Sequence, residues 1–113
     1  MITLEKLLKL PRHQRLRKIE KILTQYEYQL VGKQLGTEKI SDEYIQNIVY
    51  LLVQDNEFDE PIREYLKSKY LELQTQIGNR EPVNRIRHLL LSLLGTSVAD
   101  WDFIDAEGRL SRT

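Results

Sequence analysis

Cysteine is absent from this sequence, and glycine, proline and tryptophan are scarce. Without cysteine there are no disulfides and no thiolate-ligated zinc or iron-sulfur sites, so the composition favours the cytoplasm over a secreted location. No apolar run approaches the roughly 20 residues of a membrane-spanning helix, and no membrane partner is expected. What remains is typical of one globular domain, because 41% of the 113 residues are hydrophobic and 30% are charged.

The sequence also lacks any pattern that would assemble a catalytic or metal site. His13 and His88 are the two histidines, and neither stands in a His-x-x-x-His or Glu-x-x-His spacing. The acidic residues of 55–60 lack the glycine and the closing glutamate of a calcium loop. We therefore expect no catalytic, cofactor-binding or metal-ligating residue in this chain, and a small self-sufficient enzyme is the least favoured class of function.

Apolar residues recur at spacings of three and four along most of the chain, and no stretch shows a sustained alternation of apolar and polar residues. This periodicity predicts an all-α fold, a compact bundle or short superhelix of about five helices. The first two expected helices cover residues 3–9 and 12–34. A third begins after Ser41, a fourth runs from Asp59 to Gly78, and a fifth runs from Pro82 to Gly95. The longest apolar run, residues 89–94, is expected to be a buried part of the last helix.

The helical pattern ends at Gly95, which predicts a helical domain over residues 1–95 and a non-helical tail or linker over 96–113. Trp101, Phe103 and Ile104 are too apolar to be left in water, so we expect them to dock on the helices. The last eight residues have the composition of a linker, which suggests that a further domain follows.

The net charge of zero conceals an uneven distribution of charge along the chain. Residues 1–35 carry eight Lys or Arg against three Glu, a balance of +5, whereas residues 36–75 carry four against nine, a balance of −5. Residues 76–113 carry five of each sign. Such asymmetry concerns association with other molecules more than it concerns fold, and it indicates a polyanionic partner for the N-terminal region.

Most of this positive charge lies in residues 10–21, whose sequence is LPRHQRLRKIEK. A wheel at about 100° per residue, with the apolar stripe of the helix turned inward, places His13, Arg17, Lys18 and Lys21 on the opposite half. Arg12 and Arg15 lie at the apolar edge, where long side chains can extend outward to solvent. These six residues are candidates for binding RNA phosphates, and the alternative is an ordinary solvated helix face.

A second basic group comes from Arg80, Arg85, Arg87 and His88 near the fifth helix. Arg85 and His88 share one face at a spacing of three residues, so both join the RNA-binding candidates. The alternative is that these arginines pair with acidic side chains. Tyr28 and Tyr50 project away from the apolar stripes of their helices. They could stack on bases, and the alternative is that they are ordinary exposed tyrosines.

Two segments give the chain a resemblance to a known family. Residues 10–18 near the start, and the stretch from Leu94-Gly95-Thr96 to Trp101-Asp102-Phe103, resemble the helical N-terminal extension of some bacterial SpoU-type (SPOUT, TrmH-like) RNA methyltransferases. In that family a linker leads into a catalytic domain with an Asn-x-Gly signature and a knotted pocket for S-adenosylmethionine. This sequence reaches Thr113 before those motifs, so no catalytic or cofactor residue of the family is carried onto it.

The resemblance implies an accessory domain that holds structured ribosomal or transfer RNA while a separate domain methylates a ribose 2′-hydroxyl. The second hypothesis is a helical interaction or oligomerisation module that docks a protein partner or a second copy without binding RNA. The acidic middle third favours this alternative, because RNA-binding domains usually carry net positive charge.

Overall fold

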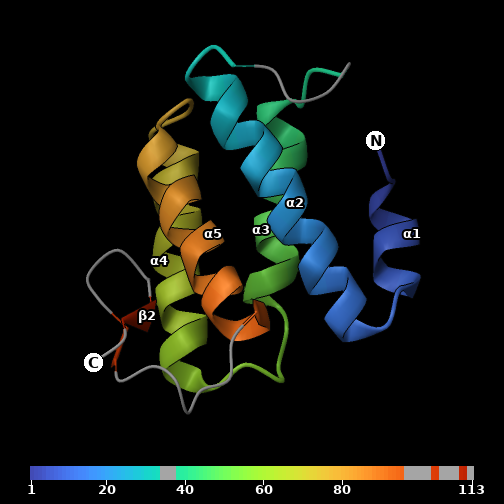
Figure 1. The fold of residues 1–113 in the computed structure, drawn as a ribbon, viewed down its shortest axis with the longest axis vertical. Coiled ribbons are helices and arrows are strands. Elements are labelled where there is room, and N and C mark those ends of the chain that lie inside the picture. Colours follow the sequence, from blue (N-terminus) through green and yellow to red (C-terminus); the bar gives the residue numbers. More distant parts are fainter. Residues whose placement is uncertain (34–37, 96–102, 105–109, 112–113) are drawn as a thin grey trace.

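The computed structural model describes residues 1–33 and 38–95, together with residues 103–104 and 110–111. Over residues 1–33 and 38–95 the fold is all-α, as predicted, and consists of five helices (Figure 1). The helices are α1 (Leu4–Lys9), α2 (Arg12–Leu30), α3 (Asp42–Val53), α4 (Glu60–Thr75) and α5 (Arg80–Gly95). A break between α1 and α2 falls at Leu10 and Pro11, because a proline disfavours helical backbone in the residue before it.

Helices α2 to α5 form a bundle in which α5 packs against both α2 and α4, and α3 packs against α4 (Figure 1). Contacts at both ends show that α2 and α5 run in opposite directions: Arg17 of α2 reaches Leu94, and Glu27 of α2 reaches Arg80. Short α1 lies along α2 on the side away from α5, where it buries Leu7 completely. The side of α2 that faces no other helix is therefore left for solvent.

One continuous core lies between the helices, and the predicted apolar stripe of α2 contributes much of it. This stripe consists of Leu16, Ile19, Leu23, Tyr26 and Leu30. The first four are buried and Leu30 is half-buried, so the inward direction chosen for this helix is confirmed. The other helices contribute mainly Ile and Leu side chains that are fully buried, among them Ile45, Ile48, Leu52, Leu66, Ile86 and Leu90. Burial of such side chains from water is the main stabilising contribution in a domain of this size.

The end of α2 differs from the prediction, because the helix stops at Leu30 and does not continue to residue 34. Gly32 adopts a φ of 80°, a left-handed conformation that glycine reaches without strain. The amide of Gly32 donates to the carbonyl of Gln29 at 3.1 Å, and the amide of Lys33 donates to Tyr28 at 2.9 Å. This pair of bonds is the Schellman arrangement that closes a helix, and it turns Lys33 back beside Tyr28.

The connection from α2 to α3 is held by side chains that bond to the backbone. Gln29 clamps Ile40, donating to its carbonyl at 2.9 Å and accepting from its amide at 2.8 Å. Ser41 then caps α3, since its hydroxyl accepts from the amide of Tyr44 at 3.1 Å, as the sequence predicted. Tyr26 donates to Asp42, which ties the middle of α2 to the first turn of α3.

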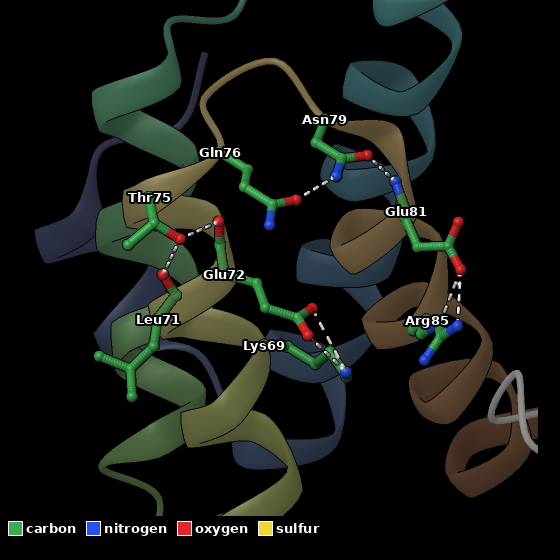
Figure 2. Close-up of polar contacts among 8 residues, drawn as sticks. All are labelled: Lys69, Leu71, Glu72, Thr75, Gln76, Asn79, Glu81 and Arg85. Atoms are coloured by element: carbon green, nitrogen blue, oxygen red, sulfur yellow. Dashed lines mark hydrogen bonds and ion pairs between the residues drawn. The ribbon is translucent and has the colours of Figure 1, made fainter.

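The corner between α4 and α5 also corrects the predicted boundaries. Helix α4 ends at Thr75, whereas the sequence predicted a helix as far as Gly78, and Ile77 therefore lies outside the helix and is 64% exposed. Helix α5 begins at Arg80, two residues before Pro82. The side chain of Asn79 accepts from the amide of Glu81 at 3.0 Å and so caps this start (Figure 2). Pro82 fits in the first turn because no helical bond needs its nitrogen there.

Beyond α5, the described residues are two short strands, β1 (Phe103–Ile104) and β2 (Leu110–Ser111), which pair in antiparallel fashion. The predicted docking of Trp101 and most of the predicted linker lie outside the described residues.

Candidate nucleic-acid interface

The first half of α2 presents basic side chains on its outward face. His13, Arg17, Lys18 and Lys21 are all exposed, as the helical wheel predicted. Three of them, Arg17, Lys18 and Lys21, are here named the cationic strip. Since an α-helix rises about 1.5 Å per residue, the strip extends over roughly 6 Å of the helix axis.

The charges of the cationic strip are not neutralised by other described residues. Lys18 and Lys21 form no hydrogen bond or ion pair within the described part of the chain. Arg17 Nε donates to His13 Nε2 at 2.9 Å, and one terminal nitrogen donates to the Leu94 carbonyl at 3.4 Å, so its positive charge stays uncompensated. The acid within the strip, Glu20, is half-buried and accepts from the Thr24 hydroxyl at 2.8 Å.

Arg12 is not available to the strip. Its Nε lies 2.9 Å from Asp55 Oδ2 and 2.8 Å from Glu57 Oε2, in the acidic connection between α3 and α4. The guanidinium carbon also lies 4.6 Å from the centre of the Phe58 ring, which is the geometry of a cation–π contact. Arg12 therefore joins the start of α2 to the connection between α3 and α4.

This arrangement gives a prediction that separates Arg12 from the strip. Arg12→Gln should lower the free energy of unfolding by about 1 kcal/mol, because it removes a charge-assisted hydrogen bond from the nearly buried carboxylate of Asp55. RNA affinity should change less than twofold when both proteins are fully folded. Urea unfolding and RNA titration of the same samples would test both statements, and a large loss of affinity with unchanged stability would contradict them.

Arg15 and the α5 candidates are less exposed than the strip. Arg15 is half-buried, and its Nε has no hydrogen-bond partner among the described residues. Arg85 pairs with Glu81 one turn earlier, with its terminal nitrogen 2.6 Å from Glu81 Oε1 (Figure 2). Hydrogen bonding to that carboxylate raises the pKa of Arg85. His88 is half-buried on the same side of α5.

The sequence analysis raised the pairing of the α5 arginines with acidic side chains, but it did not identify Glu27 as the partner where α2 crosses α5. Glu27 is buried, with only 5% of its surface exposed, and its carboxylate accepts three hydrogen bonds from α5. The donors are Arg80 Nε at 2.9 Å, Asn84 Nδ2 at 2.7 Å and Arg87 Nε at 2.6 Å. A local signal existed, because Glu27 directly follows the buried stripe residue Tyr26 and sits at the edge of the apolar face.

The environment of Glu27 favours its ionised form. Desolvation by burial raises the pKa of this carboxyl, but the hydrogen bonds from Asn84, Arg87 and Arg80 outweigh it and hold the pKa below its ordinary value. The carboxylate is therefore charged at neutral pH and orients both arginines. Because 80, 84 and 87 fall on one side of α5, the network faces α2, whereas Arg85 lies about 130° around the helix from the middle of that side.

Two hollows lie at opposite ends of α2. One, of about 380 Å³, is lined by Glu27, Tyr28, Val31, Lys33, Arg80 and Arg87. The other, of about 530 Å³, is lined at the start of the helix by Arg12, His13, Leu16, Glu57, Phe58, Asp59, Ile62, Leu93 and Leu94. The first has more cations than anions in its wall, and the second has two acids beside Arg12.

Other classes of site find no support in the described residues. No three His, Asp or Glu side chains within them come together in a way that would hold a metal ion. None of the described helices has the length and apolar character to cross a membrane. Comparisons with protein-family models, with curated proteins and with solved structures found no match.

Proposed function

We propose that this domain binds structured RNA through the cationic strip. The observation that carries the proposal is that Arg17, Lys18 and Lys21 are exposed on one helix face without a bonded carboxylate among the described residues. Clustered cations of this kind neutralise backbone phosphates and release condensed counterions, which is the main source of affinity for nucleic acid. A contact made mainly to phosphates would hold RNA by its backbone and shape, with little sequence preference.

In this proposal the domain is the accessory part of an RNA 2′-O-ribose methyltransferase. Its task would be to hold ribosomal or transfer RNA, while a separate domain binds S-adenosylmethionine and carries out methyl transfer. The resemblance of residues 10–18 and of the stretch around Trp101 supports this assignment. In this proposal the domain supplies phosphate contacts, and the chemical step belongs to the separate domain.

The second candidate function is a protein interface, and the end of α5 favours it. The sequence predicted that residues 89–94 are buried, but Leu91 and Leu93 are 40% and 41% exposed. Covering an exposed aliphatic side chain with a partner removes apolar surface from water, which favours association. A partner of this kind would respond to Leu91→Ser and Leu93→Ser, and its affinity would depend weakly on salt.

RNA binding predicts a steep dependence of affinity on salt concentration. The double variant Lys18→Gln/Lys21→Gln should lower the slope of log K against log salt by about 1.4 to 1.8 and weaken binding roughly 25- to 60-fold near 0.1 M salt. Fluorescence anisotropy with a transfer RNA and a ribosomal RNA hairpin, at several salt concentrations, would measure both quantities.

The matched control is Lys39→Gln/Lys67→Gln, which removes the same charge from two exposed lysines without contacts in the described residues. This control should leave the slope nearly unchanged. If neither RNA binds even at low ionic strength, the RNA proposal is wrong. Equal losses in the two double variants would show that general charge, and not the strip, determines the affinity.

A further inference from the structure

The Glu27 network holds two arginines in a defined orientation and leaves their outer nitrogens available. Arg80 and Arg87 each donate to the carboxylate through Nε. The terminal nitrogens of both guanidinium groups make no hydrogen bond with other described residues. One carboxylate thus positions two guanidinium groups, and each keeps the pair of donors that suits a tetrahedral oxyanion.

Both arginines line the hollow of about 380 Å³ at this end of α2. Lys33 lies in the same wall, where the Schellman turn at Gly32 places it, and Tyr28 adds an exposed side chain without a hydrogen bond in the described residues. Three cations against Glu27 give the wall a formal charge of +2. The volume is at the small end of the range for ligand sites, roughly 300–1,000 Å³, so it suits a compact group.

We propose that this hollow is a binding site for a phosphomonoester group. Such a group carries a charge of about −1.5 to −2 at pH 7 and three acceptor oxygens, which match the charge of the wall and the donors of Arg80, Arg87 and Lys33. A backbone phosphodiester carries one charge and has two ester links, and it suits the open cationic strip better than a recess. The site is separate from the strip, and its existence does not depend on RNA binding.

The presence of two arginines beside one carboxylate supports a phosphate site over a purely structural role for the network. A single guanidinium would neutralise Glu27, and Asn84 already supplies a further donor at 2.7 Å. The second arginine adds a positive charge beside a hollow that already contains Lys33. Since uncompensated like charges repel one another, this excess is favourable when an anion is bound.

Nuclear magnetic resonance of the ¹⁵N-labelled full chain would test the site directly. Titration with inorganic phosphate should shift the Nε–H signals of Arg80 and Arg87 saturably, and chloride at matched ionic strength should not reproduce the shift. Lys33→Gln should weaken this binding roughly tenfold, because one charge-assisted bond is lost. Lys33 is exposed, so folding should be unaffected. Lys39→Gln, an equally exposed lysine of the same connection, is the matched control and should leave the affinity unchanged.

Two further ligands identify the source of the phosphate. A 5′-phosphorylated RNA oligonucleotide that binds more tightly than both its 5′-hydroxyl form and adenosine monophosphate would indicate the end of an RNA chain. Equal affinity for adenosine monophosphate and the phosphorylated oligonucleotide would indicate a free phosphorylated metabolite.

A linear shift that chloride reproduces would overturn the site. This site is rejected, and the proposed function is left intact, if three results occur together. RNA affinity falls in Lys18→Gln/Lys21→Gln, it is the same with and without a 5′-phosphate, and inorganic phosphate does not bind saturably. Saturable phosphate binding without RNA affinity would support this site and reject the proposed function.

Discussion

Replacing Glu27 with alanine is expected to lower the free energy of unfolding by about 3 kcal/mol, near the lower end for removing one partner of a buried ion pair. The carboxylate accepts hydrogen bonds from three side chains of α5, and its removal leaves Arg87, which is only 19% exposed, without its anion. We take the lower end because Arg80 is 56% exposed and water can solvate it. Urea unfolding at neutral pH, followed by circular dichroism, would measure the loss.

The pH dependence of this loss gives an internal check. Because the pKa of Glu27 is lowered in the folded state, its stabilising contribution is fully present above the ordinary value of 4.5 and disappears as the pH falls through the folded-state pKa. The difference in unfolding free energy between wild type and Glu27→Ala should therefore shrink in acid. Glu64→Ala, at an exposed carboxylate of α4 without contacts among the described residues, should change stability by less than about 0.5 kcal/mol at any pH.

Glu27→Ala also bears on the phosphate site, since the two arginines lose the group that orients them. We expect weaker phosphate binding in spite of the added positive charge. A stability loss below 1 kcal/mol that does not vary with pH would show that the network contributes little to holding α2 against α5.

Local patterns in the sequence predicted the helices well, because each depends on residues a few positions apart. The stripe of Leu16, Ile19, Leu23, Tyr26 and Leu30 gave the inward face of α2, and the outward face with its cations followed from the same wheel. Ser41 was identified as a cap from its place before Asp42 and Glu43. The end of α2 and the start of α5 were less well predicted. The Schellman turn at Gly32 and the cap by Asn79 depend on hydrogen bonds to backbone amides, which the apolar periodicity does not report.

The partners of the charged residues were beyond local reasoning. Arg12 meets Asp55 across 43 positions of sequence, and Glu27 meets Arg80 and Arg87 across 53 and 60. The wheel placed Arg12 at the apolar edge and Arg17 on the outward half, but it could not identify the carboxylates that Arg12 meets. That pairing arises only when α2 packs beside the acidic connection that follows α3. Sequence reasoning therefore identified the basic helix but included residues that the fold assigns to ion pairs.

Packing of the apolar stripe of α2 against the core holds the cationic strip in place. Leu23 is the middle residue of the apolar stripe and has no exposed surface. Leu23→Ala is expected to lower the free energy of unfolding by roughly 3 kcal/mol, from lost burial and from the cavity left behind. For a domain of this size that corresponds to a fall in Tm of roughly 10 °C or more, which calorimetry would measure. Lys18→Ala, on the outward face of the same helix, should lie within about 0.5 kcal/mol of wild type, since both residues favour helices. At a temperature where Leu23→Ala remains folded, its RNA affinity should match wild type, whereas Lys18→Ala should bind more weakly. Equal stability of the two variants would mean that α2 does not pack through this stripe.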